Sequence, residues 1–407
     1  MVIFWLVLLG GLPTFSLGLL VWVVGHHLLT AEIPSAFSHK VKFRFLHCML
    51  LYVIALGNIL EKLKIASMPG FVQFLHDLLP IKKDPKVLVT NLRFGTIPVR
   101  LFQPKAASPR LHRGIIFFHG GGAMFGSLDC YHSLCSFLAR ETDSVLLSVG
   151  YRKLPDYHFP VASYDCLNAS IHFLKTLETY GVDPSRVVLC GESIGGGAVA
   201  NVIQALVGRQ DLPQIRAQVL IYPIVQVINF QLPSVRQNQN IPFLNRDFMM
   251  TCVCKYLSID LSWKDAMLKG TCISEDAWEK YRKWLSSDNI PKRFRSKDHE
   301  PEFPGPFNEA AYLETKHTLD VGNSPLIADD EVIARLPEAF VVSCEGDTLR
   351  DDALLYKKRL EDHGIPVTWY HVEDGFHGCI IFFDKKLFSF PCSKNIMNAI
   401  VRYIKDI

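Results

Sequence analysis

The feature that most constrains the fold is a serine enclosed by glycines. Gly191-Glu192-Ser193-Ile194-Gly195 follows the apolar run 186–190 and precedes a helical pattern over residues 194–208. In the G-x-S-x-G pattern the serine occupies a sharp turn from a strand into a helix. Glycines are needed on both sides because larger side chains would strike the adjoining strand and helix. The pattern predicts Ser193 as a nucleophile held above the end of a sheet.

A second glycine segment, His119 to Gly122, supplies groups that would complement this serine. His119, Gly120, Gly121 and Gly122 follow the apolar run 114–118. Bare backbone N–H groups can approach a developing negative oxygen closely where no side chain blocks them. Together with the N–H of Ile194, this loop is predicted to form an oxyanion hole.

The same glycines allow an alternative interpretation as a phosphate-binding loop. Gly120, Gly122 and Gly126 follow a strand-like run with the spacing GxGxxxG. A dinucleotide site also needs an acidic residue roughly 20 residues further on, at the end of the next strand. That strand ends instead in Gly150-Tyr151-Arg152. The sequence therefore disfavours a nucleotide-binding oxidoreductase.

A serine hydroxyl needs a base, and the base needs an acid to orient it. In chains with this kind of serine turn, the three residues occur in the order serine, acid, histidine, and the acid and the histidine each follow one of the late strands. Asp347 follows the apolar run 339–344, and His377 follows the run 366–372. His371 is the nearest competing histidine but lies inside a strand, and Asp351 and Asp352 fall in the next helical pattern. We therefore predict Ser193, Asp347 and His377 as the catalytic residues.

Strand-like and helix-like patterns alternate over about 290 residues, which is typical of a mostly parallel sheet with helices on both faces. A hairpin is expected at Gly95-Thr96. No internal repeat is present. The expected strands are 86–94, 97–103, 114–119, 144–149, 186–190, 217–222, 339–344 and 366–372, and the expected helices are 161–179, 194–208, 351–363 and 395–407.

Two segments fall outside this alternation. Residues 225–323 show no clean strand and are too long for a loop, so we expect a helical cap inserted into a catalytic domain of residues 86–407. Residues 28–85 are expected to form a further helical or cap region. Within them the apolar run 45–56 is short for a membrane span and fits a buried or membrane-surface helix better.

The first residues predict a membrane anchor. Residues 1–31 carry no charged side chain, and residues 2–24 are almost wholly apolar. About 23 helical residues span the hydrocarbon layer of roughly 30 Å. A cleaved signal peptide is the alternative, but it would have a basic start and a shorter apolar core. We expect an uncleaved transmembrane helix over residues 1–27.

Composition excludes several other classes. The formal net charge of +3 is too small, and its basic residues too scattered, to indicate a nucleic-acid partner. Neither CxxC nor HExxH occurs, so no metal site is expected. Eleven cysteines leave at least one unpaired within the chain, and one or two disulfides are conceivable in an oxidising compartment. Asn168-Ala169-Ser170 is a glycosylation sequon.

Taken together, the motifs resemble a known family. His119 to Gly122, the run Gly150-Tyr151-Arg152-Lys153-Leu154-Pro155, the stretch Gly191 to Gly197, Ser324-Pro325-Leu326, the run Gly346 to Asp351 and Gly375-Phe376-His377-Gly378 are similar to the hormone-sensitive-lipase group of α/β-hydrolases. With the apolar first segment, the match is to arylacetamide deacetylase-like proteins of the type-3 and type-4 subgroup.

The resemblance implies a serine esterase or deacetylase of the α/β-hydrolase fold, with Ser193, Asp347 and His377 as its triad and no cofactor. Apolar lipid or aryl esters or amides are the implied substrates. It also implies a single-pass type II anchor with the catalytic domain in the lumen of the endoplasmic reticulum. The basic residues Lys40, Lys42 and Arg44 would favour the opposite orientation.

The elbow departs from the family's usual residues. Glu192 replaces the usual Asp, Ile194 replaces a common Ala, and Gly197 replaces a frequent Asn. The backbone N–H of Ile194 is retained, but its β-branched side chain could narrow the acyl pocket. A catalytically weak or inactive binding protein on the same scaffold is therefore the alternative to an active hydrolase.

Overall fold

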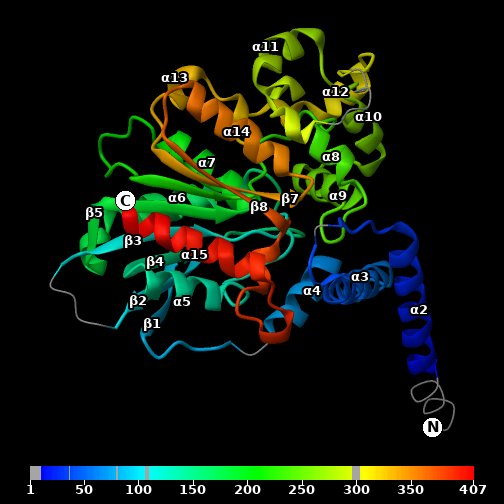
Figure 1. Ribbon diagram of the computed structural model, residues 1–407, viewed down its shortest axis with the longest axis horizontal. Helices are drawn as coiled ribbons and strands as arrows, with labels where there is room; N and C mark the ends of the chain where they lie inside the picture. The colour runs from blue at the N-terminus through cyan, green and yellow to red at the C-terminus, as the bar shows by residue number, and fades with distance from the viewer. Residues whose placement is uncertain (1–10, 36, 79–80, 106–109, 296–302) are drawn as a thin grey trace.

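An eight-stranded sheet forms the centre of the molecule in the computed structural model, which describes residues 11–35, 37–78, 81–105, 110–295 and 303–407 (Figure 1). Its strand order is β1-β2-β4-β3-β5-β6-β7-β8. The pairings of β2 with β1 and with β4 are antiparallel, and all the others are parallel. The strands are β1 Val87–Phe94, β2 Ile97–Pro104, β3 His112–Phe118, β4 Ser144–Val149, β5 Val182–Glu192, β6 Ala217–Ile221, β7 Glu338–Gly346 and β8 Val367–Phe376.

Helices cover both faces of this sheet, and each face carries its own apolar core. One core packs α6 (Val161–Lys175), α7 (Ile194–Leu206) and α14 (Arg350–Asp362) against the strands. The other packs α5 (His132–Glu141) and α15 (Pro391–Asp406) against the opposite face. Every residue of β4 and β6 is buried, which explains why these strands are apolar on both sides.

The predicted fold class is confirmed. The hairpin joins β1 to β2 with Phe94 paired to Ile97, as expected from Gly95-Thr96. The helix expected over 161–179 is divided in two, because α6 ends at Lys175 and a separate 3-10 turn spans Leu177–Tyr180. Each of the eleven cysteines is a free thiol, so the disulfides considered from the sequence are not formed.

Helices follow one another between β6 and β7, where residues 225–323 have no strand in the part that the structure describes. They gather above the ends of β7 and β8 in Figure 1. The inserted helices are α8 Pro233–Gln237, α9 Arg246–Leu257, α10 Lys264–Lys269, α11 Glu275–Leu285 and α12 Glu309–Thr315.

In the part of the chain that the structure describes, three helices precede the sheet: α2 (Leu12–Thr30), α3 (Lys40–Lys62) and α4 (Met68–Asp77). By length and composition α2 and α3 could each cross a membrane. The first ten residues of the expected anchor lie outside the described residues, and the rest form most of α2, which stands away from the body (Figure 1).

The apolar run 45–56, which was expected to form a buried or membrane-surface helix, lies within the longer helix α3. The helix continues through charged residues at both ends and reaches 23 residues. Charged side chains do not interrupt an amphipathic helix when they face solvent, so the apolar run underestimated its extent. Phe43, Leu46 and His47 of α3 are buried, in keeping with the buried-helix interpretation.

Close contact between α7 and the sheet depends on Gly195. A Cβ atom there would lie 2.2 Å from the carbonyl oxygen of Phe118 and 2.7 Å from that of His119. Both oxygens belong to the end of β3 and the loop after it, so the backbone could not move away without distorting the sheet. The first turn of α7 can therefore lie directly beside β3 only with glycine at this position.

We expect Gly195→Ala to lower the free energy of unfolding by about 1–3 kcal/mol, because the added methyl group overlaps backbone atoms. Urea unfolding followed by circular dichroism measures the change. Gly364→Asn is the control: Gly364 has φ of +73° with open space around it, and Asn tolerates this conformation. Its effect should stay below about 0.5 kcal/mol. Equal stability of the two variants would contradict the steric argument.

Candidate active site

Ser193 occupies the turn between β5 and α7 in an unusual backbone conformation. Its φ is +54° and its ψ is −124°, a region that non-glycine residues rarely adopt. The turn is fixed by its neighbours, since the Ser193 N–H donates to the Ile221 carbonyl at 2.9 Å. This geometry directs the side chain away from the strand, and the serine is 8% exposed.

The three residues predicted to act together are in contact. Ser193 Oγ lies 2.8 Å from His377 Nε2. His377 Nδ1 lies 2.9 Å from one carboxylate oxygen of Asp347 and 3.1 Å from the other. His377 follows β8 and Asp347 follows β7, so adjacent parallel strands bring them together at one edge of the sheet. The hydrogen-bonded chain runs from the serine through the imidazole to the buried carboxylate.

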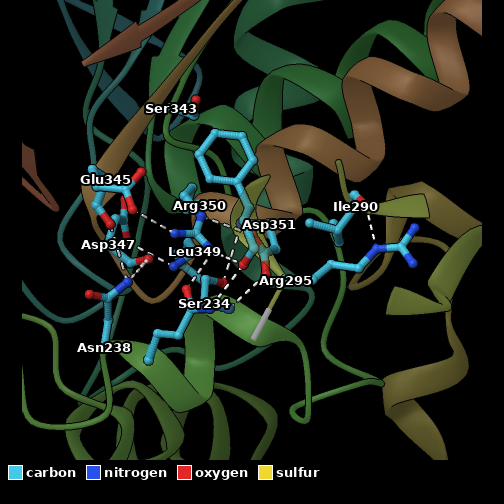
Figure 2. A network of polar contacts seen from close by, with 12 residues as sticks. Ser234, Asn238, Ile290, Arg295, Ser343, Glu345, Asp347, Leu349, Arg350 and Asp351 are labelled. Atoms are coloured by element: carbon cyan, nitrogen blue, oxygen red, sulfur yellow. Dashed lines mark hydrogen bonds and ion pairs between the residues drawn. The ribbon is translucent and has the colours of Figure 1, made fainter. Parts of the chain in front are cut away.

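The Asp347 loop is held by residues of the inserted segment. The Asn238 side chain donates to the carbonyls of Glu345 and Asp347, at 3.2 and 3.0 Å (Figure 2). The Leu349 N–H donates to the Asp347 carboxylate at 2.7 Å. Both ends of the acidic residue, backbone and side chain, are thus fixed by hydrogen bonds.

A buried ion pair continues this network. The Arg350 guanidinium donates to Asp351 at 3.0 Å and to Glu345 at 3.1 Å, and Arg350 and Asp351 are almost fully buried. The Asp351 carboxylate also accepts the Ser234 N–H at 2.6 Å, linking α14 to α8 (Figure 2). Asp351 and Asp352 therefore serve the packing of the insertion and do not contact His377, as expected from their helical position.

The glycine loop lies beside the serine. Gly121, Gly122 and Ile194 line the same cavity as Ser193 and His377. Ile194 is the first residue of α7, and N–H groups of the first helical turn have no partner within the helix. Backbone N–H groups of the loop and of Ile194 can therefore donate to the oxygen of a carbonyl group whose carbon lies at Ser193 Oγ.

His119 and Gly120 contribute differently from the two later glycines. The His119 ring is fully buried, with Nδ1 2.8 Å from the Gly120 carbonyl and its plane stacked on Tyr151. Burial lowers the pKa of His119 to about 3, so the ring is neutral. The Tyr151 hydroxyl donates to the His119 carbonyl at 2.7 Å. His119 and Gly120 do not line the cavity, whereas Gly121 and Gly122 do, so His119 supports the loop from behind it.

Glu192 was noted in the sequence only as a departure, but its carboxylate connects several parts of the site. It accepts hydrogen bonds from the hydroxyls of Tyr131 and Tyr222, the latter at 2.6 Å. Tyr222 in turn accepts the Ile380 N–H, three residues after His377, at 3.3 Å. Burial raises the pKa of Glu192, and the two hydroxyls oppose that rise. Sequence reasoning missed both tyrosines because no motif marks them.

An apolar cavity of about 750 Å³ has Ser193 in its wall. Its walls come from segments far apart in the sequence: α3, α4, α9, the start of α7 and the loop after His377. A volume of this size suits a ligand of some tens of atoms. The residues Leu46, Met49, Leu50, Val53, Val72, Phe248, Met249, Val253, Leu257, Ile381 and Phe382 form most of the apolar lining.

One group of possible metal ligands occurs in the part of the chain that the structure describes. Glu345, His371 and Glu373 bring ligand-type atoms within 4.8 Å of one another. His371 is already bonded through Nδ1 to Ser343 and through Nε2 to Glu345, and Glu345 also pairs with Arg350. The group is accounted for as an ion-pair network. Asn168 of the sequon is exposed on α6.

Comparison with known proteins places this chain in a family. The alpha/beta hydrolase fold family matches residues 115–283 and 306–381. Human arylacetamide deacetylase-like 4 is 70% identical over 99% of both chains, and mouse neutral cholesterol ester hydrolase 1 is 36% identical over 74% of this chain and 76% of its own. A hyperthermophilic esterase from the archaeon Pyrobaculum calidifontis shares the fold, with a TM-score of 0.61, 21% identity and coverage of 92% and 99%. The family predicted from the motifs is thus confirmed, and the chain belongs to the arylacetamide deacetylase-like branch of the α/β-hydrolases.

Proposed function

We propose that this carboxylic ester hydrolase works through Ser193 as nucleophile, His377 as general base and acid, and Asp347 as the orienting acid. The observation that carries the proposal is the 2.8 Å contact between Ser193 Oγ and His377 Nε2 while Nδ1 is bonded to Asp347. A hydroxyl and an imidazole in this relation can exchange a proton as the oxygen attacks a carbonyl.

The proposed reaction has two acyl-transfer steps. Ser193 Oγ bonds to the ester carbonyl carbon, and its proton passes to His377 Nε2. The backbone N–H groups of Gly121, Gly122 and Ile194 stabilise the negative oxygen of the tetrahedral intermediate. When the carbon–oxygen bond to the alcohol breaks, His377 returns the proton to the alcohol. A water molecule, deprotonated by the same imidazole, then releases the acid and restores Ser193.

Apolar acyl or aryl groups are the proposed substrates. The cavity beside Ser193 is lined almost throughout by aliphatic and aromatic side chains. A relative named neutral cholesterol ester hydrolase is consistent with a lipid ester. Ile194 lines the cavity next to the nucleophile, so its branched side chain is expected to limit the width of groups bound there.

We also propose that residues 1–27 anchor the protein, that residues 28–85 complete the wall of the site, and that residues 225–323 cap it. Side chains of α3, α4 and α9 line the cavity and support this division. The apolar α2 supports a membrane location. The family resemblance favours a catalytic domain, residues 86–407, on the lumenal side of the endoplasmic reticulum.

A fluorophosphonate probe tests the nucleophile. The natural protein should be labelled, Ser193→Ala should not, and turnover of a soluble ester should fall by about 10⁶-fold in the variant. Ser163→Ala, another serine of the same cavity, should keep its label. An unlabelled but folded natural protein would instead favour the inactive binding protein on a hydrolase scaffold.

The pH profile tests His377 and Asp347. Burial lowers the pKa of His377, but the Asp347 carboxylate and its hydrogen bond outweigh this effect and raise the pKa above 6.5. The base must be neutral, so kcat/KM should fall as the pH drops through a value above 6.5. In Asp347→Asn burial prevails, and this limb should move to lower pH while kcat falls about 10⁴-fold. If the acidic limb of the pH profile lay at the same pH in Asp347→Asn and in the natural protein, the assignment of His377 and Asp347 would be contradicted.

Glycosylation tests the orientation. If the catalytic domain is lumenal, the exposed Asn168 side chain meets the glycosylation machinery as the chain enters the lumen. The protein expressed in membranes should then carry a glycan that endoglycosidase removes. The Asn168→Gln variant should carry none. Ser170→Ala removes the same sequon, though Ser170 is buried. Protease sensitivity of the catalytic domain in sealed vesicles would overturn a lumenal orientation.

A further inference from the structure

Exposed apolar side chains gather on one face beside the cavity. Val41, Phe45 and Met49 of α3 are spaced four residues apart, so they form one stripe, and their exposures are 83%, 53% and 48%. Leu387 and Phe388, in the 3-10 turn Lys386–Phe388, are 85% and 41% exposed. We name these five residues the α3 face. Single exposed apolar residues are ordinary, but a contiguous set indicates a binding surface.

The α3 face is one connected unit although its parts are more than 300 residues apart. The ring of Phe45 stacks on that of Phe388 with centroids 6.3 Å apart. The Lys42 ammonium donates to the Ser389 carbonyl at 2.6 Å and fixes the turn against the helix. In Figure 1 the red segment before α15 correspondingly reaches the blue helices.

Basic residues border this apolar surface. Together with apolar side chains of the face, His39, Lys40 and Lys42 line a shallow hollow of about 580 Å³. Lys386 is exposed next to Leu387. Apolar groups beneath a rim of lysines match the two layers of an anionic lipid surface, acyl chains below and phosphates above.

The α3 face is continuous with the catalytic cavity. Phe388 lines both the shallow hollow and the cavity at Ser193. Met49, the last residue of the stripe, also lines the cavity, and Leu50 and Val53 continue the apolar wall along α3. An acyl chain could therefore pass from the face to Ser193 beside the apolar side chains of Phe388, Met49, Leu50 and Val53.

The position of α3 decides how a membrane can meet it. Phe43 is 1% exposed and packs edge-on against Phe376 and Phe243, with ring centroids 4.7 and 5.0 Å away. Phe376 precedes His377, so α3 is built into the wall of the site and cannot cross a bilayer while the site is intact. α2 packs along α3 through a hydrogen bond of 2.7 Å between Ser16 and Tyr52, which keeps the apolar α2 beside the exposed stripe.

We propose that the α3 face lies on the surface of an anionic lipid bilayer and that long-chain acyl esters pass from the bilayer, beside Phe388 and Met49, to Ser193. This inference rests on the proposed ester hydrolase activity and adds its route of substrate entry. α2 holds the protein to the membrane, whereas the α3 face sets the side from which the cavity is filled.

The test compares two esters with the full-length protein in proteoliposomes of phosphatidylcholine and phosphatidylserine. 4-Methylumbelliferyl oleate is presented in the bilayer, and 4-nitrophenyl acetate is presented in water. We expect the double variant Val41→Asp, Leu387→Asp to hydrolyse the oleate at least tenfold more slowly and the acetate within twofold of the natural rate. Leu313→Asp, an equally polar change at a side chain of α12 that is 56% exposed, should alter neither rate.

A charge variant tests the lipid surface itself. Without phosphatidylserine the natural protein should cleave the bilayer oleate at least threefold more slowly, and the variant Lys40→Glu, Lys386→Glu should lose this dependence. An unchanged oleate rate in the apolar double variant would overturn the proposal. An equal loss of the hydrolysis rate with both esters would also overturn it, because such a loss indicates damage to the site. A change in the protein's mass by light scattering would overturn it as well, because it indicates that the α3 face is an interface between two copies. Absence of acetate hydrolysis in the natural protein would instead refute the ester hydrolase activity.

Discussion

The strained turn at Ser193 is the constraint on which the rest of the site depends. A positive φ at a serine between β5 and α7 is retained because both neighbours fix it: the Ser193 N–H is bonded to β6, and α7 lies against β3 through Gly195. The same turn brings Ser193 and Ile194 to the cavity that Gly121 and Gly122 also line. One local conformation thus sets the positions of the proposed nucleophile, Ser193, and of the Ile194 N–H that we propose stabilises the oxyanion.

Two buried polar networks keep the partners of this serine in place. Around Asp347, Asn238, which follows α8, and the Arg350–Asp351 pair of α14 hold the loop. Around Glu192, the hydroxyls of Tyr131 and Tyr222 converge on one carboxylate. Buried groups of this kind fix a single arrangement because any other would leave charges or donors unsatisfied. The insertion therefore contacts the loop that carries Asp347 and also lines the cavity.

The cavity links the chemistry to the segments that precede the sheet. α3 contributes buried aromatic contacts next to His377 and, on its opposite side, the exposed stripe of the α3 face. A helix with one face in the core and another apolar face in solvent is not explained by the fold alone. The proposed contact with lipid accounts for the exposed face, and for the basic residues at its start, in a protein whose apolar α2 lies alongside.

The sequence by itself determined the strands and the fold class and predicted Ser193, Asp347 and His377 as partners, because these depend on local patterns and on a fixed chain order. It underestimated α3, whose charged ends concealed its length, and gave Glu192 no role. Only the tertiary structure decided which side chains surround the triad. Tyr131, Asn238 and Met49 carry no motif, and they reach the site because packing joins segments that are distant in the chain. Such contacts depend on the whole folded chain, which no local pattern encodes.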